Sequence, residues 1–307
     1  MSIRVRVPAT SANMGPGFDS LGIALNLYNE FEFNEIENGL KFKGMPEEFC
    51  NEDNIIYKAM KFCFDKAGYK IKGLEISEIK QDVPVARGLG SSSTCIVGGL
   101  VGANAILGNK FSKDELLDMA TEIEGHPDNV APALLGGMVV AATEDKKTFF
   151  DKIKVHEGLK FITIVPNFRL STEKARSVLP KELTMKDGVY NVSRAALMVA
   201  CLSSGKFEVI RTACKDAFHQ NYRSKLIPGF EKVYNKSYEL GALGCYLSGA
   251  GPTIMVVIDE KDERFSNKLE KFLNEENLQW DILELSLDSE GATIIKGDYW
   301  WVEITWL

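Results

Sequence analysis

The 307-residue sequence predicts an α+β fold divided into two domains. Its length exceeds what a single hydrophobic core of ordinary size holds. Strand-like and helix-like runs alternate along the chain, and three glycine-rich turns each stand beside a strand-like run. We place the boundary near residue 158, which gives domains of residues 1–158 and 159–307.

The first domain is expected to contain four strands, marked by apolar alternation or short apolar runs: residues 3–7, 21–32, 74–79 and 136–142. Helices are expected at 54–68 and 95–107, where apolar or small residues recur at helical spacing. A third helix should follow Ser112, because Glu115 stands three residues later and completes a capping box. The charged stretch 144–154 predicts either a hairpin or a crossing segment.

The second domain is expected to alternate strands and helices in the same way. Strands are predicted at 161–165, 253–258 and 282–285, and helices at 190–202, 207–211, 230–240 and 262–274. The aromatic C-terminal stretch 298–307, DYWWVEITWL, fits either a last strand packed on this domain or a contact between subunits. The second reading follows from the enrichment of tryptophan at interfaces.

The composition excludes several classes of function. A net charge of −7 and the lack of a basic run argue against nucleic-acid binding. No apolar stretch approaches membrane-spanning length, and the N-terminal residues follow a strand pattern rather than that of a signal peptide. Six scattered cysteines without CxxC spacing indicate reduced thiols in a cytoplasmic protein. A helix start near Cys95 would lower its pKa, but we expect this thiol to be packed and unreactive.

The most informative motif is the turn at residues 84–94, PVARGLGSSST. Gly88 and Gly90 let the backbone approach a ligand closely, and the three serines that follow fall where a helix begins. Free N–H groups and the helix dipole make such a position an anion site. The turn lacks the spacing of a Walker A loop and of a dinucleotide fingerprint. It therefore predicts a phosphate site of another type, and the alternative is a tight turn with a serine cap.

Two further glycine-rich segments strengthen this prediction. Residues 8–25, PATSANMGPGFDSLGIAL, follow the first strand and hold Asn13 and Asp19, for which an Asx turn is the structural alternative. Residues 247–257, LSGAGPTIMVV, form another glycine turn that opens into a β-branched strand. One such turn is ordinary, but three in a chain of this size point to a ligand site.

Together these segments resemble the signature motifs of the GHMP kinases, named for galactokinase, homoserine, mevalonate and phosphomevalonate kinases. Residues 84–92 fit the family's loop pattern P-x-x-x-G-L-G-S-S. Within the family the chain is most similar to the homoserine kinases. This similarity rests on PATSANMGPGFDSLG at 8–22, EGHPDNVAP at 124–132, STxxAR at 171–176 and HQxYR at 219–223, and it extends from residue 3 to about 295.

The resemblance implies both a fold and an activity. The first domain should have a ribosomal-protein-S5-domain-2-like fold and the second a ferredoxin-like fold. The implied activity is ATP-dependent phosphorylation of the L-homoserine hydroxyl to O-phospho-L-homoserine, in threonine biosynthesis. The protein is expected to be a homodimer that binds a small-molecule substrate, with no nucleic-acid or membrane partner.

The resemblance also implies the nucleotide site. Its residues would be Asn54, Pro84, Val85, Ala86, Arg87, Gly88, Leu89, Gly90, Ser91, Ser92, Ser93 and Thr94. Asn54 reads equally well as the N-cap of its helix. Ser92 and Glu124 would hold Mg²⁺, which prefers oxygen ligands; the alternative for Glu124 is an exposed carboxylate at a helix end.

On the acceptor side, the resemblance assigns the substrate carboxylate to Arg176 and Arg223 and the ammonium to Asp19, supported by Asn13. An arginine pair suits a carboxylate because guanidinium donates two parallel hydrogen bonds. The remaining residues expected here are His126, Asp128, Asn129 and Gly251.

We expect Asn129 and Arg176 to carry the catalysis. An asparagine orients a hydroxyl but does not take its proton, so the γ-phosphate or solvent would do so. Positioning and electrostatics would then supply most of the rate.

Two alternatives stay open. The chain could be a GHMP kinase for L-threonine, shikimate or an isoprenoid alcohol, or a non-catalytic sensor of the same fold. The arginine pair and Asp19 favour an amino acid over an isoprenoid alcohol, which has no ammonium group. L-threonine offers the same zwitterion, so only the size of the site would separate it from L-homoserine.

Overall fold

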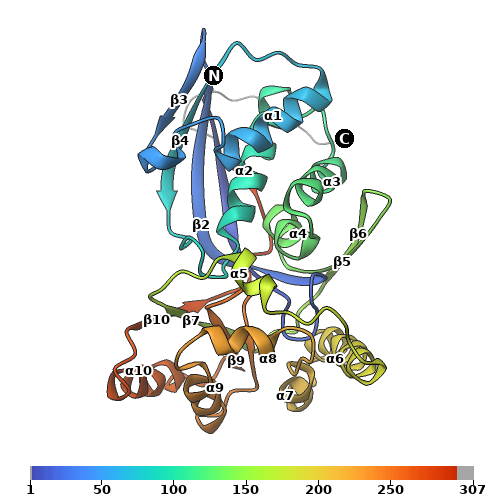
Figure 1. Cartoon of the computed structure of the whole chain (residues 1–307), viewed down its shortest axis with the longest axis vertical. Coiled ribbons are helices and arrows are strands. Elements are labelled where there is room, and N and C mark those ends of the chain that lie inside the picture. The colour runs from blue at the N-terminus through green and yellow to red at the C-terminus, as the bar shows by residue number, and fades with distance from the viewer. Residues whose placement is uncertain (1, 296–307) are drawn as a thin grey trace.

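The computed structural model describes residues 2–295, so the predicted contact of residues 298–307 lies outside the described chain. These residues form a seven-stranded and a four-stranded sheet, which lie one beyond the other along the long axis of the molecule (Figure 1). Each sheet with its helices forms one half of the molecule. No helix within residues 2–295 is long and apolar enough to cross a membrane.

The larger sheet has the strand order β11-β1-β2-β4-β3, with β5 added beside β2 and β6 beside β5. Its strands are β1 (Ser2–Ala12), β2 (Leu21–Glu35), β3 (Gly39–Lys43), β4 (Gly73–Gln81), β5 (Met138–Glu144), β6 (Lys147–Ile153) and β11 (Thr293–Ile295). Only the β3–β4 pair within this described sheet is parallel. The charged stretch 144–154, left open between two readings, belongs to the β5–β6 hairpin.

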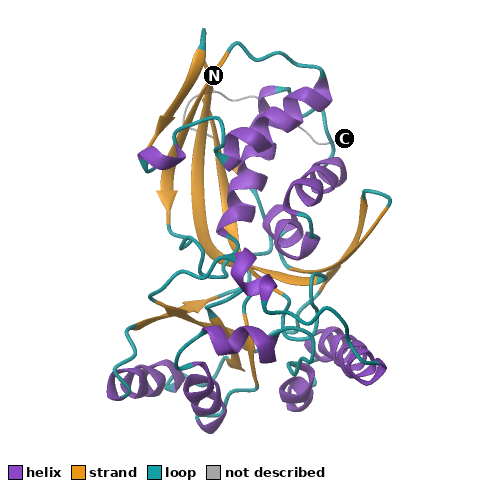
Figure 2. Ribbon diagram, viewed as in Figure 1, coloured by secondary structure: helices purple, strands orange, loops and turns teal. Residues whose placement is uncertain are grey.

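Four helices pack on one face of this sheet (Figure 2): α1 (Ile55–Ala67), α2 (Ser91–Ile106), α3 (Lys113–Glu124) and α4 (Pro127–Leu135). The predicted caps are confirmed. The Asn54 side chain accepts hydrogen bonds from the first turn of α1, and Ser112 forms a capping box with Glu115 on α3. A short 3₁₀ turn, Glu47–Phe49, precedes α1.

Glycines set how closely α2 approaches its neighbours. A Cβ atom added at Gly98 would lie 2.6 Å from the Phe31 ring, and one at Gly102 would lie 2.3 Å from the Phe33 ring. At Gly99 it would lie 2.6 Å from the backbone oxygen of Ile56 in α1. No side chain fits at these distances, so the small residues allow α2 to lie against β2 and α1. This close packing fixes the direction in which the start of α2 points.

The smaller sheet is antiparallel, with strand order β10-β7-β9-β8. Its strands are β7 (Leu159–Pro166), β8 (Gly244–Leu247), β9 (Ile254–Asp259) and β10 (Trp280–Leu285). The helices of this half are α5 (Thr172–Ser177), α6 (Met185–Ser204), α7 (Ile210–Ala213), α8 (Gln220–Arg223), α9 (Phe230–Glu239) and α10 (Phe265–Glu275), with 3₁₀ turns at Phe207–Val209 and Ser224–Leu226. Numbered within this half, the strand order is 4-1-3-2, which confirms the predicted ferredoxin-like arrangement.

Both faces of the smaller sheet are buried. One face packs against α9 and α10. The other packs against α6, α7 and the apolar ends of β1 and β2, including Ala9, Leu21 and Ile23. The two halves therefore share a hydrophobic core, and in Figure 1 the short helix α5 lies where they meet.

The chain passes from the larger to the smaller sheet between Ile153 and Leu159. It later returns. Strand β11 pairs with β1, with Arg4 opposite Ile295 and Arg6 opposite Thr293. These last three residues were expected in the second domain, but they extend the sheet of the first. Strand β11 pairs along the edge of β1 that β2 leaves open, so the return completes the pairing of β1 on both sides.

Candidate active site

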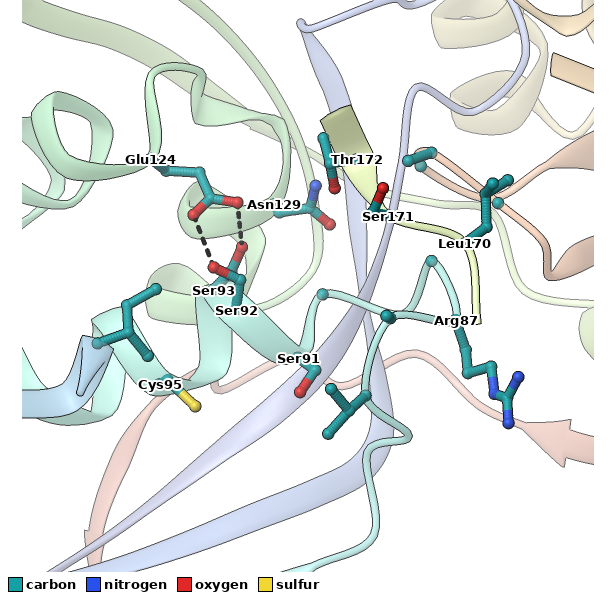
Figure 3. A pocket seen from close by; sticks show the side chains of 18 of the residues that line it. Arg87, Ser91, Ser92, Ser93, Cys95, Glu124, Asn129, Leu170, Ser171 and Thr172 are labelled. Atoms are coloured by element: carbon teal, nitrogen blue, oxygen red, sulfur yellow. Dashed lines mark hydrogen bonds between the residues drawn. The ribbon is translucent and has the colours of Figure 1, made fainter. Parts of the chain in front are cut away.

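A cavity of about 530 Å³ lies between the two halves and receives residues from both. Its walls come from the turn before α1, the glycine-rich loop and start of α2, the α3–α4 connection, α5, α8 and the turn after β8. Figure 3 shows Ser91, Ser92 and Ser93 on one side of this space and Leu170, Ser171 and Thr172 on another.

The glycine-rich loop takes backbone conformations that favour glycine and contacts residues of both halves. Gly88 and Gly90 have φ values of +83° and +71°, which residues with a Cβ rarely adopt. A Cβ at Gly90 would also lie 2.0 Å from Thr10 Oγ1. Ser248 Oγ donates to the Gly88 carbonyl at 2.6 Å, so two of the predicted glycine-rich segments are in direct contact.

The start of α2 offers unpaired donors to the cavity. Gly90 occupies the N-cap position, and no side chain within the described residues caps the helix. The 16-residue helix brings the positive end of its dipole to the same place. Ser91, Ser92 and Ser93 all line the cavity there. This arrangement suits a bound phosphate.

Next to the helix start, two hydroxyl groups converge on one carboxylate (Figure 3). Ser92 Oγ donates to Glu124 Oε2 at 3.1 Å, and Ser93 Oγ donates to Glu124 Oε1 at 3.3 Å. Burial raises the pKa of Glu124, against the lowering effects of the His126 charge and the Ser92 hydrogen bond. No lysine or arginine among residues 2–295 forms a salt bridge with Glu124. This oxygen-rich set with an uncompensated carboxylate fits a hard cation.

The opposite end of the cavity, near α1, is largely apolar. Its walls include Met45, Phe49, Ile55 and Ile56, which suit a flat aromatic base. Asn54 lies here, but its hydrogen bonds are used within the protein. Its Oδ1 accepts from the backbone nitrogen of Ile56 at 2.9 Å, and its Nδ2 donates to the Phe49 carbonyl at 2.9 Å.

Two titratable groups at this end have shifted pKa values. Burial raises the pKa of Glu78 to about 7. Burial also raises the pKa of Cys95 to about 12, with a smaller contribution from the Glu78 charge. The dipole at the start of α2 does not overcome this desolvation, so the Cys95 thiol stays protonated and unreactive at neutral pH.

The part of the cavity beside α5 holds an ion pair between the two halves. Arg176 on α5 donates to Asp19, from Nη2 to Oδ1 at 2.8 Å and from Nη1 to Oδ2 at 3.2 Å. The Asp19 backbone nitrogen donates to Asn13 Oδ1 at 3.0 Å, and Asn13 Nδ2 donates to the Gly249 carbonyl at 2.9 Å. Asn13 therefore supports Asp19, as expected. This contact spans six residues, so it is not the Asx turn that was the structural alternative.

Arg223 is buried beside this pair. Its Nε donates to the Ala175 carbonyl at 3.1 Å and its Nη1 to the Gly249 carbonyl at 3.0 Å. Desolvation, together with the nearby charge of Arg176, lowers the pKa of Arg223 to about 10. The guanidinium carbons of Arg176 and Arg223 lie 5.5 and 5.3 Å from the centre of the Phe18 ring. Both guanidinium groups therefore lie near the same aromatic ring, and both residues line the cavity.

The α3–α4 connection supplies the remaining polar wall. His126 Nδ1 lies 2.5 Å from Asp128 Oδ1. Burial alone would lower the pKa of His126, but the hydrogen bond and charge of Asp128 outweigh it and raise the pKa. Asn129 Oδ1 accepts from Thr10 Oγ1 at 2.7 Å. Its Nδ2 has no hydrogen-bond partner among residues 2–295, so Asn129 offers donors rather than an acceptor to the cavity.

Most of the residues predicted from the sequence line this one cavity. They are Asn13, Asp19, Asn54, Val85, Ala86, Arg87, Gly88, Gly90, Ser91, Ser92, Ser93, Glu124, His126, Asp128, Asn129, Arg176, Arg223 and Gly251. Pro84, Leu89 and Thr94 do not line it. Leu89 is buried in the core shared by the two halves. The Thr94 hydroxyl donates to the Ser91 carbonyl at 2.8 Å, so Thr94 supports the loop from behind.

Sequence reasoning missed several cavity residues. Ser171 and Thr172 stand in the quoted 171–176 motif and Ala250 in the 247–257 motif, so the signal was present but was assigned to neighbouring residues. Phe18 does not line the cavity, but its ring lies near Arg176 and Arg223; it stands within the 8–25 segment and was likewise passed over. Glu78 gave no signal, because it is one of several polar residues at the end of a predicted strand.

Comparisons with known proteins agree with this geometry. The family model described as "GHMP kinases N terminal domain" matches residues 54–137, and the one described as "GHMP kinases C terminal" matches residues 198–275. A homoserine kinase of Clostridium beijerinckii is 82% identical over 295 residues, covering 96% of this chain and 99% of the relative. A homoserine kinase of Clostridium botulinum is 68% identical over 296 residues, covering 96% and 99%.

A solved structure agrees as well. The crystal structure of homoserine kinase from Cytophaga hutchinsonii superposes with a TM-score of 0.86 at 30% sequence identity, covering 96% of this chain and 97% of that one. The predicted two-domain GHMP kinase fold is confirmed. By sequence, by fold and by the motifs gathered in its cavity, the chain belongs to the homoserine kinase family of the GHMP kinases.

Proposed function

We propose that this protein transfers the γ-phosphoryl group of ATP to the side-chain hydroxyl of L-homoserine, giving ADP and O-phospho-L-homoserine. One observation carries the proposal. The same cavity joins an uncapped helix start to two arginines and an aspartate, so a phosphate site adjoins groups that match the two charges of an amino acid. The 82% identity to a homoserine kinase supports this choice of acceptor.

In this proposal ATP lies along α2. Its base occupies the apolar end near α1 and its phosphates meet the backbone of residues 88–93. Ser92 and Glu124 would hold Mg²⁺, since their oxygens converge and no lysine or arginine among residues 2–295 forms a salt bridge with Glu124. A bound Mg²⁺ would neutralise negative charge on the phosphates during transfer.

The amino acid is held by its two charged groups. Its carboxylate binds between Arg176 and Arg223. Arg223 lines the cavity, and its Nη2 makes no hydrogen bond within residues 2–295. Its ammonium pairs with Asp19. Because Asp19 and Arg176 pair with each other in this structure, the substrate exchanges that contact for two of its own.

The chemistry requires no strong protein base. Asn129 donates from Nδ2 to the acceptor oxygen, because its Oδ1 is already engaged by Thr10. The hydroxyl oxygen attacks the γ-phosphorus, the bond to the ADP oxygen breaks, and the hydroxyl proton passes to the transferred phosphate or to solvent. Orientation by Asn129 and positive charge from Arg176 then lower the barrier.

Three further expectations belong to the same proposal. The protein works in the cytoplasm, which fits six free cysteines among the described residues. It forms a homodimer, and its functional halves are residues 1–158, which hold nucleotide and metal, and 159–307, which complete the substrate clamp.

A coupled ADP-release assay with Mg-ATP and an acceptor panel tests the function. The panel contains L-homoserine, L-threonine, L-serine, shikimate and mevalonate. We expect a clear preference for L-homoserine in kcat/KM. Preference for L-threonine would replace the acceptor, and preference for mevalonate would overturn the charge-based assignment of the clamp. Protein that binds ATP but turns over no acceptor would favour the sensor alternative.

A further inference from the structure

Behind Arg223 lies a buried polar cluster that does not line the cavity. It consists of Asn191, Asp216, His219 and Gln220, each 8% exposed or less. The proposed function uses none of these side chains. Burying a polar group costs free energy unless the group forms hydrogen bonds. The hydrogen bonds of this cluster therefore show which parts of the chain it holds in place.

The His219 ring links two segments that both reach the active site. Its Nε2 lies 2.9 Å from the Gly15 carbonyl oxygen, and its Nδ1 lies 3.4 Å from Arg223 Nη1. A carbonyl oxygen only accepts and a guanidinium nitrogen only donates. The ring must therefore carry its proton on Nε2 and keep a lone pair on Nδ1. Neutral imidazole is the one form that satisfies both partners.

The other members of the cluster fix the backbone on either side of this ring. Asp216 Oδ2 accepts from the backbone nitrogens of His219 and Gln220 at 2.8 and 2.7 Å. Asp216 Oδ1 accepts from Asn191 Nδ2 at 2.8 Å, and the same Nδ2 lies 3.2 Å from the Pro16 carbonyl. Asp216 Oδ2 is 3.8 Å from His219 Nε2, too far for a hydrogen bond.

The two partners of His219 belong to opposite sides of the proposed amino-acid site. Gly15 lies in the loop that carries Asn13 and Asp19, which would meet the ammonium group. Arg223 would meet the carboxylate. These charges of an amino acid sit a fixed distance apart, so a clamp built from two separate chain segments needs a spacer between them. His219 occupies the position of that spacer.

We propose that His219 is a positioning residue for the amino-acid substrate, whose neutral ring joins the Asp19 loop to Arg223 and sets the spacing of the clamp. The inference rests on the proposed function for the identity of the substrate. It does not rest on it for the state of the ring, which can be measured without turnover. A histidine that only fills the core would leave substrate affinity unchanged once the protein has folded.

Two substitutions separate the two contacts. His219→Gln places an amide near the former Nε2, so it keeps a donor for Gly15 and loses the acceptor for Arg223. His219→Asn places an amide near the former Nδ1, so it keeps a partner for Arg223 and loses Gly15. His156→Gln is the matched control, because His156 is exposed and lies outside the cavity. Folding of each variant is checked by thermal melting before kinetics.

We expect His219→Gln to raise KM for L-homoserine about tenfold or more, with KM for ATP within about twofold of the parent value. His219→Asn should raise KM for L-homoserine less, and the control should not change it. The proposal is overturned if folded His219→Gln keeps the parent KM for L-homoserine, or if both KM values rise equally.

Nitrogen-15 spectra of the histidine rings at neutral pH give an independent test. The chain has three histidines, and His156→Gln and His219→Asn each remove one set of signals and so assign the rest. We expect His219 to be neutral with its proton on Nε2. An imidazolium ion, or a proton on Nδ1, would overturn the proposal whatever the kinetics show. If L-homoserine proves not to be the acceptor, this spectrum still decides the state of the ring, so the two failures are distinguishable.

Discussion

Arg176 and Asp19 are 157 positions apart in the sequence and form a two-pronged ion pair across the cavity, with N–O distances of 2.8 and 3.2 Å. The pair connects α5 of the second half to the loop between β1 and β2 of the first. Each partner is also the proposed ligand of one charge of the substrate. A zwitterion can therefore replace the pair without leaving either residue unpaired, whereas a singly charged acceptor cannot.

Substituting Asp19 should reduce selectivity for acceptors that carry an ammonium group. In Asp19→Asn we expect kcat/KM for L-homoserine to fall about 10–100-fold, because a hydrogen bond to a charged group contributes roughly 1.5–3 kcal/mol. The analogue 4-hydroxybutyrate lacks the ammonium group, so kcat/KM for this acceptor should fall much less. Steady-state kinetics on both acceptors gives the ratio of the two kcat/KM values. Asp82→Asn is the control, because Asp82 is exposed. Equal losses on both acceptors would show that Asp19 does not recognise the ammonium.

Substituting Glu124 should weaken the binding of Mg²⁺, so that the reaction requires a higher Mg²⁺ concentration. For Glu124→Gln we expect kcat to fall by a factor of about 100 and the Mg²⁺ concentration for half-maximal rate to rise, because a neutral amide is a poorer ligand for a hard cation. Glu122→Gln is the matched control, since Glu122 is exposed on the same helix and pairs with Lys66 and Lys146. Activity titrated with Mg²⁺, and Mn²⁺ binding followed by electron paramagnetic resonance, report both effects. An unchanged metal requirement would remove Glu124 from the metal site.

Asn129 should affect turnover more than binding. In Asn129→Ala the acceptor hydroxyl loses its donor, so we expect kcat to fall about 10–100-fold while KM for L-homoserine changes little. Asn129→Asp should not restore the rate, because a carboxylate beside the phosphates adds repulsion. Single-turnover measurements separate chemistry from product release. Faster chemistry in Asn129→Asp would indicate that a base is useful here and would contradict the proposed proton path.

Glu78 should make stability depend on pH. Its pKa is raised by burial to about 7, above the value of 4.5 for the exposed side chain. Its contribution to stability is therefore fully present below pH 4.5 and is lost as the pH rises through about 7. Because the group is only partly buried, we expect a change of the order of 1 kcal/mol after solvent screening. Glu78→Gln should show a smaller fall in melting temperature than the parent between pH 5 and pH 8. Glu75→Gln on the same strand serves as control, and parallel curves for parent and Glu78→Gln would exclude the effect.

The sequence predicted the parts of the site that depend on local chemistry. Gly88 and Gly90 stand out because glycine adopts positive φ angles more readily than other residues do, and the serines after them mark a helix start wherever the rest of the chain lies. Ser112 and Glu115 likewise predict the start of their helix, because a capping box involves residues only three positions apart. The fold class followed from motifs of this kind together with the resemblance that they carry.

What the sequence could not predict depends on contacts between distant residues. Helix α4 was not predicted, because Pro132 inside it breaks the usual helical pattern. The role of Thr94 behind the loop follows from a contact with Asn29 on β2. The hydrogen bonds of His219 involve Gly15, 204 positions away, and no pattern within either segment reveals them.

Strand β11 pairs with β1, so the outer strand of the first half's sheet comes from residues that follow the whole smaller sheet in the sequence. On the ribosome, β1 is made long before β11, because the whole smaller sheet lies between them in the sequence. A fragment ending at residue 158 would therefore leave one edge of β1 unpaired, and unpaired edges recruit other chains. Folding of the first half cannot finish before β11 has been made, and the growing chain must keep that edge protected in the meantime.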